Sequence, residues 1–131
     1  KRFGNVFIID LHSMPSNYNY KYKEVDFVIG NNFDKSSSKL TREILSNNIQ
    51  SMGYKYLFND PYSGGYITKN YSSLDKKVQC IQLEINKKLY MDERKLIKNK
   101  NFQCFSDELK MILENFFNDV DCNQESMFAA E

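Results

Sequence analysis

The chain of 131 residues carries 18 basic and 17 acidic side chains, a formal net charge of +1, and 41% of its residues are hydrophobic. This length and composition predict one domain with one buried core. Charges of both signs are interspersed and no apolar run is long enough to cross a bilayer, so we expect neither a nucleic-acid nor a membrane partner. Three widely spaced cysteines without a Cys-x-x-Cys pair predict reduced thiols and a cytoplasmic protein.

The first predicted element is a strand over residues 5–10, which ends in Asp10 and is followed by His12, the only histidine. Its β-branched and aromatic residues are typical of a strand buried on both faces of a parallel sheet, and ligands gather where such strands end. Asp10 and His12 share one face of an extended chain, so the carboxylate can orient the imidazole as a metal ligand. A lone histidine can equally be structural.

Residues 14–23 predict a loop, and its turn-forming residues and three tyrosines suit either the lining of a cleft or a surface connection. Residues 26–30 predict a second strand that ends in a glycine turn. From Ser38 to Met52, apolar residues recur at helical spacing. Ser38 can cap the start of this helix, and Gly53 can end it in a left-handed conformation.

Residues 54–58 predict a third strand, followed over residues 59–66 by a cluster of turn residues with two consecutive glycines. Such glycines let a chain approach a ligand closely. Residues 78–85 predict a fourth strand, in which Glu84 faces away from the side that carries two isoleucines and a leucine. Glu84 is therefore either a functional carboxylate or a solvated residue on an edge strand.

The last predicted helix spans about residues 105–120, with Ser106 as a plausible cap and an apolar stripe that indicates core packing. Beyond Asp121 the periodicity is lost, which predicts a frayed tail. Neither a glycine-rich phosphate loop nor a Gly-x-Ser-x-Gly elbow occurs. The remaining chemistry is that of a metal-assisted hydrolase built from His12 and Glu84.

Four motif-like segments follow one another along the chain, at residues 10–15, 26–30, 59–68 and 82–91. Together they resemble the motif series of N-formylglutamate amidohydrolases over residues 5–93. The resemblance implies an α/β fold, a mixed and mostly parallel sheet flanked by helices, similar to zinc carboxypeptidases and aspartoacylase-type deacylases. It also implies hydrolysis of N-formyl-L-glutamate, a small-molecule substrate, to formate and glutamate in histidine breakdown.

Carried over by position, the resemblance implies that His12 is a zinc ligand and Glu84 the general acid/base. Zinc takes imidazole nitrogen and lowers the pKa of water, and a nearby carboxylate can move the proton to the leaving amine. Tyr62 and Tyr66, on the glycine cluster, either close over the substrate or are simply packed aromatics.

The substrate of the family carries carboxylates, so cationic partners are expected in this chain. Lys69 and Lys87 occupy positions where the family usually has arginine, and lysine keeps the charge but loses the two-pronged geometry. Arg42 is the other candidate, although its helical setting fits a solvated face equally well.

A catalytic zinc site normally uses three protein ligands, and the related enzymes supply two from an upstream His/Glu pair. This chain has a single histidine and begins with lysine. We therefore expect residues 1–120 to be the C-terminal portion of the domain, with 121–131 as its tail, in need of an N-terminal half or prone to self-association. The alternatives are a non-catalytic fragment, or a relative that acts on another acylated amino acid or a peptide.

Overall fold

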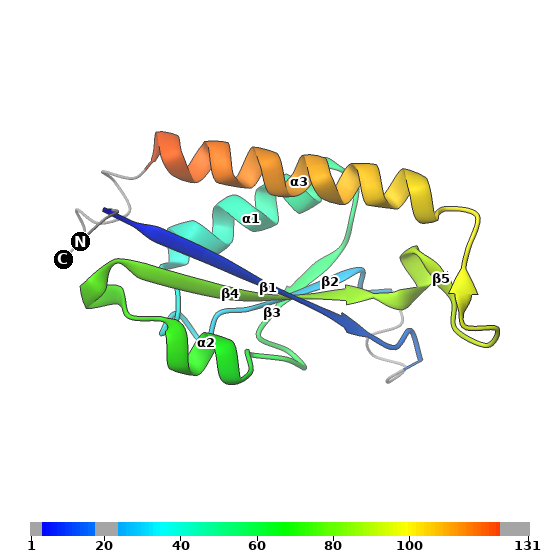
Figure 1. Cartoon of the computed structure of the whole chain (residues 1–131), viewed down its shortest axis with the longest axis horizontal. Helices are drawn as coiled ribbons and strands as arrows, with labels where there is room; N and C mark the ends of the chain where they lie inside the picture. Colours follow the sequence, from blue (N-terminus) through cyan, green and yellow to red (C-terminus); the bar gives the residue numbers. More distant parts are fainter. Residues whose placement is uncertain (1–3, 18–23, 124–131) are drawn as a thin grey trace.

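The computed structural model describes residues 4–17 and 24–123, so most of the loop predicted at 14–23 and most of the predicted tail lie outside the described residues. A four-stranded sheet forms the centre of the molecule. Helices α1 and α3 cover one face of the sheet, and the short α2 lies on the other side (Figure 1). The α/β class with a mixed sheet, predicted from the sequence, is confirmed.

The elements follow one another along the chain with short connections. In order they are β1 (Val6–Met14), β2 (Phe27–Gly30), α1 (Lys39–Ser51), β3 (Tyr56–Phe58), α2 (Tyr66–Tyr71), η2 (Leu74–Lys76), β4 (Val78–Asn86), η3 (Lys87–Leu89), β5 (Met91–Asp92), β6 (Ile97–Lys98) and α3 (Phe102–Cys122).

The sheet has the strand order β1-β4-β2-β3. β1 runs parallel to β4 and β2 runs parallel to β3, and an antiparallel β2–β4 pairing joins these two halves. The β1–β4 register sets His12 opposite Glu84 and Met14 opposite Asn86. The two longest strands therefore end together, at the right-hand end of the molecule in Figure 1.

The core lies between the sheet and the helices α1 and α3. Apolar side chains of β4 and β2 pack there against one buried stripe from each helix, and this core includes Phe27, Ile29, Leu45, Ile49, Ile81, Leu83, Ile112 and Phe116. A smaller cluster of Met14, Val25 and Val28 lies apart from this core, with Leu57 and Tyr62 packed against it.

Helix α1 agrees with its prediction at both ends. The Ser38 hydroxyl accepts a hydrogen bond from the backbone N–H of Thr41 at 3.1 Å, and Gly53, with φ of +85°, follows the helix. Helix α3 starts at Phe102, earlier than predicted, and Ser106 lies inside it. The start is earlier because Phe102 packs edge-on against Tyr90, so the apolar stripe begins one turn sooner.

Two further predictions need correction, and one element was not predicted. Asp121 lies in α3, which runs to Cys122, so a tail that begins at residue 121 is wrong. The turn cluster predicted to residue 66 stops one residue short, because Tyr66 begins α2, and the β5–β6 hairpin was not predicted. Among the described residues, no helix combines the length and the apolar character that crossing a membrane requires.

The prediction for β1 was wrong in length and in burial. The strand continues past residue 10 to Met14 because every residue from Val6 on has a partner in the nine-residue β4. The strand was expected to be buried on both faces, yet it stands at the end of the strand order, and Leu11 is 50% exposed. In contrast, nearly all of β4 is buried.

Candidate functional site

His12 and Glu84 meet where β1 and β4 run side by side. Their register places them opposite each other, and His12 Nδ1 lies 3.7 Å from Glu84 Oε1. On the other side of the ring, His12 Nε2 lies 3.0 Å from Asp10 Oδ2. Alternation along β1 puts Asp10 and His12 on one face, and the parallel pairing puts Glu84 on the same face. Two carboxylates therefore flank one imidazole.

Burial and hydrogen bonding shift the pKa of Glu84 in opposite directions. The residue is only 5% exposed. Burial raises the pKa of its carboxyl above the ordinary value, while His12 and the hydrogen bond from Gln82 oppose part of this rise, and Asp10 adds to it. A carboxyl that holds its proton more tightly than usual suits a group that must both accept and return a proton near neutral pH.

Gln82 is the residue of this group that sequence reasoning did not single out. Its Nε2 donates to Glu84 Oε1 at 2.7 Å, and its own Oε1 is buried without a hydrogen-bond partner among the described residues. A Cβ on Gly65 would lie 2.9 Å from that oxygen, so the glycine lets the loop close over the amide. The signal was present in the sequence, because Gln82 shares the face of Glu84 by the period of two.

The glycine cluster is fixed against the end of β2. A Cβ on Gly30 would come within 2.8 Å of the carbonyl carbon of Ser63, so only glycine allows this approach. The backbone N–H of Asn32 also donates to the Ser63 carbonyl at 2.6 Å. On the far side of the loop, the Thr68 hydroxyl donates to the Gly65 carbonyl at 2.9 Å. The loop thus packs closely from both sides, with Gly65 over Gln82.

The structure separates the two tyrosines predicted at this loop. Tyr62 is half-buried and packs against the cluster of Met14, Val25 and Val28. Tyr66, at the start of α2, is 72% exposed and contacts Tyr71 edge-on, with ring centroids 6.4 Å apart. No hydrogen bond joins Tyr66 to His12 or Glu84 in the part of the chain that the structure describes, and closure of either tyrosine over a substrate stays a prediction.

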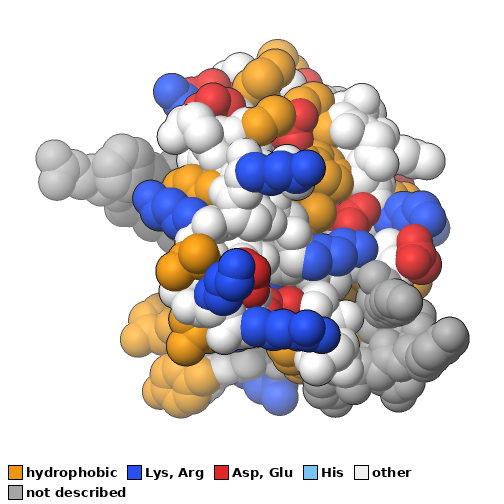
Figure 2. Space-filling model, turned by 90° about the vertical axis from the view of Figure 1, so that its right-hand side faces the viewer, with side chains coloured by type: hydrophobic (Ala, Val, Ile, Leu, Met, Phe, Trp, Pro, Cys, Tyr) orange, Lys and Arg blue, Asp and Glu red, His pale blue; other side chains and the backbone are white. Residues whose placement is uncertain are grey.

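The predicted cations also lie in different settings. Lys69 is exposed in the last turn of α2. Lys87 is half-buried directly after β4 and therefore lies at the end of the sheet where β1 and β4 stop. Figure 2 shows this end of the molecule, with Lys and Arg side chains spread across it and Asp and Glu side chains between them. Of the two lysines, Lys87 is placed nearer to Glu84 along the chain.

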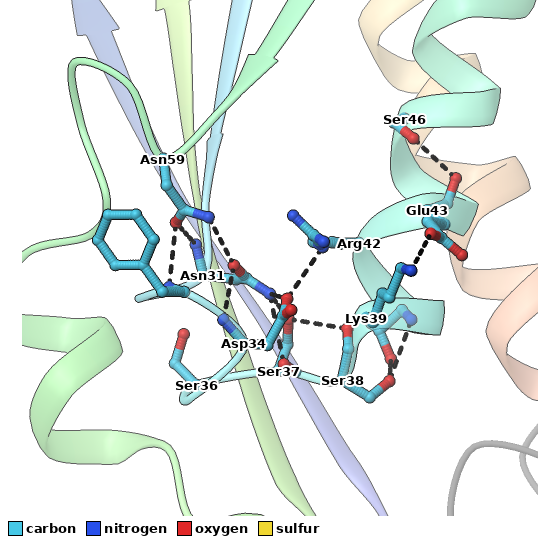
Figure 3. A network of polar contacts seen from close by, with 12 residues as sticks. Asn31, Asp34, Ser36, Ser37, Ser38, Lys39, Arg42, Glu43, Ser46 and Asn59 are labelled. Atoms are coloured by element: carbon cyan, nitrogen blue, oxygen red, sulfur yellow. Dashed lines mark hydrogen bonds and ion pairs between the residues drawn. The ribbon is translucent and has the colours of Figure 1, made fainter.

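Arg42 is committed to a polar network beyond the end of β2. Its Nε lies 2.9 Å from Asp34 Oδ1, and its guanidinium carbon lies 4.4 Å from the centroid of the Phe58 ring. Figure 3 shows the side chain directed away from α1, toward Asp34. At 16% exposure it does not lie on a solvated face, so that alternative is wrong.

Two asparagines hold this network together. The backbone N–H of Asn31 donates to Asn59 Oδ1 at 2.9 Å, and Asn59 Nδ2 donates back to Asn31 Oδ1 at 3.1 Å (Figure 3). The Asn31 amide also donates to Asp34 Oδ1 at 2.8 Å. These bonds fix a backbone in which Asn32, Phe33 and Asp34 all have positive φ. β2 runs antiparallel to β4, with Val28 opposite Glu84 and Gly30 opposite Gln82. The chain that leaves β2 after Gly30 therefore runs away from Glu84 and His12, and the network that it forms lies apart from them.

The described residues do not form a metal site on their own. No group of three or more His, Cys, Asp or Glu side chains in residues 4–17 and 24–123 is placed to hold a metal ion. His12 is 45% exposed and can offer one imidazole, while its two neighbouring carboxylates flank the ring on opposite sides. The other cysteine and acidic side chains do not complete a set of three around it.

Comparison with known proteins places the chain. Residues 1–91 match the model of the family described as N-formylglutamate amidohydrolase. The chain belongs to that family. The N-formylglutamate deformylase of Pseudomonas putida is 29% identical to it over 96 residues, which are 71% of this chain and 36% of the Pseudomonas protein. The chain therefore spans little more than a third of that relative.

Solved structures also resemble this chain, and again the chain matches only part of each of them. The crystal structure of N-formylglutamate amidohydrolase from Ralstonia eutropha JMP134 matches with a TM-score of 0.77 and 26% identity, over 88% of this chain and 42% of the other. A structure described as YNDL-apo (Zinc-free) shares the fold, with a TM-score of 0.50 and 18% identity, over 83% of this chain and 54% of the other. This chain thus corresponds to part of an N-formylglutamate amidohydrolase domain.

Proposed function

We propose that this chain carries the acid/base part of a metal-dependent amidohydrolase that cleaves the amide bond of a small N-acyl amino acid, with N-formyl-L-glutamate as its substrate. The proposal rests on one observation. His12 lies opposite Glu84 in the β1–β4 register, and both residues belong to the segment that matches the family. Zinc, bound by His12 together with ligands from outside the described residues, would polarise the formyl carbonyl and favour deprotonation of water.

Glu84 is proposed as the group that moves the proton. Its Oε1 is held by the amide of Gln82, and no hydrogen bond that the structure shows among the described residues engages Oε2. Oε2 would take a proton from the attacking water as the water oxygen bonds to the formyl carbon. As the C–N bond breaks, the same oxygen would return the proton to the leaving nitrogen, giving formate and L-glutamate. The raised pKa of Glu84 supports this double role.

The carboxylates of the substrate are proposed to meet Lys87 and Lys69. Lys87 follows β4 directly, three residues after Glu84. Lys69 lies on α2, the helix that begins one residue after Gly65, which covers Gln82. Arg42 is left out of this proposal because its guanidinium is already paired with Asp34 and lies over Phe58.

Formate release tests the proposal. The enzyme to assay is a fusion in which this chain replaces the matching part of the Ralstonia eutropha protein, loaded with zinc. Glu84→Gln should lower kcat by roughly 10²–10⁴-fold without loss of zinc, because a general acid/base group typically contributes that much. The matched control is Glu114→Gln, an exposed glutamate on α3, which should leave kcat unchanged. Near wild-type turnover in Glu84→Gln would overturn the assignment of the proton carrier.

Two other functions are separated by the same assay. The lack of a three-ligand group among the described residues favours a non-catalytic fragment. If the chain is such a fragment, the fusion should fold and bind zinc but release no formate. A deacylase or peptidase with another substrate predicts turnover of an N-acetyl amino acid or a peptide above that of N-formyl-L-glutamate.

A further inference from the structure

Gln82 lies where the backbone of the glycine cluster crosses the sheet. In the β2–β4 pairing Gly30 is directly opposite Gln82, and opposite residues in an antiparallel pair point to the same face of the sheet. A Cβ on Gly30 would lie 2.9 Å from the carbonyl oxygen of Tyr62 and 2.9 Å from the backbone nitrogen of Gly64. The loop therefore crosses this face beside Gln82, which is only 4% exposed.

Gly65 is required for the space that it leaves and not for its backbone conformation. Its φ of −108° is extended, and other residues adopt it as well. A Cβ at this position, however, would lie 2.9 Å from Gln82 Oε1. Gly65→Ala therefore changes one thing, which is the room for the amide of Gln82.

The loop is anchored on both sides of Gly65. Before it, the backbone N–H of Asn32 donates to the Ser63 carbonyl at 2.6 Å. After it, the hydroxyl of the buried Thr68 donates to the Gly65 carbonyl at 2.9 Å, and the backbone N–H of Lys69 donates to the same oxygen at 3.2 Å. A methyl group added at Gly65 would therefore displace the amide beneath it and not the loop.

The two ends of the Gln82 amide have different surroundings. Nε2 donates to Glu84 Oε1 at 2.7 Å, while Oε1 is buried against Gly65 with no hydrogen-bond partner within residues 4–17 and 24–123. A buried oxygen without a partner costs stability. The one hydrogen bond that this amide makes is thus directed at the carboxyl of Glu84.

A second buried glutamine on β4 shows what a structural amide does in this fold. Gln79 is 1% exposed, and its Oε1 accepts hydrogen bonds from the backbone N–H of Ser38 at 2.8 Å and from the Thr41 hydroxyl at 2.7 Å. Gln79 therefore secures the start of α1. Gln82 makes no comparable bond to another element in the described part of the chain, so stability alone does not account for it.

We propose that Gln82 is a positioning residue, held in place by Gly65, which fixes Glu84 Oε1 so that Glu84 Oε2 stays available for proton transfer. This role rests on the proposed function. A hydrogen bond from an amide to a carboxylate is short and directional, so it restricts the carboxyl to one orientation. The glycine cluster then acts on the reaction through Gln82 and not by touching the substrate.

The first test needs no activity and uses the 131-residue chain with ¹⁵N-labelled side-chain amides. Gln82→Met identifies the Gln82 signals by their loss. The amide proton directed at Glu84 should resonate downfield of those of the exposed Gln103, and both Glu84→Met and Gly65→Ala should move it upfield. The amide signals of Gln79 should stay in place in both variants.

The second test separates kcat from KM in the zinc-loaded fusion enzyme. Gln82→Met keeps the length of the side chain and removes the donor, so it should lower kcat by roughly 10–100-fold with KM unchanged, because small misplacements of a catalytic group can cost about 10²-fold. Gln79→Met is the matched control. It should lower the melting temperature, because Ser38 and Thr41 lose their acceptor, and leave kcat unchanged.

A double-mutant cycle tests the contact between Gly65 and Gln82, and it remains decisive if Gln82→Met fails to fold. Gly65→Ala should lower kcat by about tenfold or more in the parent enzyme. In the Gln82→Ala background it should have almost no further effect, since the added methyl then meets no amide.

Three results would count against these expectations. An amide proton that neither Glu84→Met nor Gly65→Ala moves would overturn the positioning role. If Gly65→Ala raised KM at unchanged kcat, or lowered kcat equally in both backgrounds, Gly65 would act on the substrate and the role of Gln82 would also be overturned. A parent fusion that releases no formate, while the amide proton behaves as expected, would contradict only the proposed function.

Discussion

Two clusters of polar side chains in this protein differ in how completely their hydrogen-bonding atoms find partners. Around Asn31 and Asn59 the buried amides meet partners and exchange hydrogen bonds with one another, and Asp34 pairs with Arg42, whose Nε lies 2.9 Å away without the alignment of a hydrogen bond. Around His12 and Glu84, burial raises the pKa of the Glu84 carboxyl, and Gln82 Oε1 has no hydrogen-bond partner within residues 4–17 and 24–123. A network whose polar atoms are all hydrogen-bonded stabilises the fold, whereas an unpaired polar atom beside a carboxyl with a shifted pKa is more typical of a functional site.

The largest effect on stability should come from the satisfied network. Asn31 is fully buried, and Asn31→Ala would remove the oxygen to which the buried Asn59 amide donates and the bond from Asn31 Nδ2 to the carbonyl of buried Ser37. The expected cost is about 3 kcal/mol, since each stranded buried group costs about 1–3 kcal/mol. Asn48→Ala, which removes an exposed bond to Asp119, is the matched control and should cost about 1 kcal/mol or less. Urea unfolding measures both, and equal costs would show that the two regions do not differ in this way.

A smaller effect of opposite sign is expected at Glu84. Its pKa is higher in the folded state, so its contribution to stability is present below the ordinary pKa of 4.5 and is lost as the pH rises through the folded value. Glu84→Gln should therefore raise the melting temperature by a few degrees at pH 7–8, and the gain should vanish near pH 4. Thermal unfolding from pH 4 to 8 measures this, with Glu114→Gln as the exposed control.

If Glu84→Gln lowered the melting temperature at neutral pH, the hydrogen bond from Gln82 and the attraction of His12 would outweigh burial. The His12–Glu84 group would then be as satisfied as the Asn31 network, and the contrast between the two regions would fail.

The smallest effect on stability is expected at Lys69, which is exposed on α2. Lys69→Ala should change the free energy of unfolding by less than about 0.5 kcal/mol. In the fusion enzyme, the same change should raise KM for N-formyl-L-glutamate, and Lys69→Arg should be tolerated because guanidinium restores a two-pronged contact. An equal loss on an uncharged N-formyl amino acid would show that Lys69 supports the loop and does not bind the carboxylate.

The sequence predicted a site built from His12 and Glu84, although the pairing of β1 with β4 that places them opposite each other was not predicted. Both lie on strands whose period of two places them on one face, and parallel strands end at a common edge of the sheet. The position of Arg42 could not be obtained in this way. It depends on a loop with three successive positive φ values and on the pairing of Asn31 with Asn59, which are 28 residues apart. No local pattern encodes that contact.

The error over β1 is informative in itself. Residues 5–10 have the composition of a strand inside a sheet, yet the structure places β1 at the edge, with Leu11 half-exposed. A sequence suited to an interior strand at an open edge is consistent with a sheet that continues in a part of the domain outside this chain. The short α2 and the β5–β6 hairpin were missed for a simpler reason, because six-residue and two-residue elements carry little periodic signal.

The central claim is that His12 and Glu84 form a reactive pair that needs further ligands from outside the described residues. Equilibrium dialysis at neutral pH measures this directly. The 131-residue chain alone should retain no stoichiometric zinc at submicromolar free metal, and its complex with the remaining part of the Ralstonia eutropha protein should retain one zinc ion that His12→Ala removes. Stoichiometric zinc on the chain alone, or a complex whose zinc survives His12→Ala, would contradict the account.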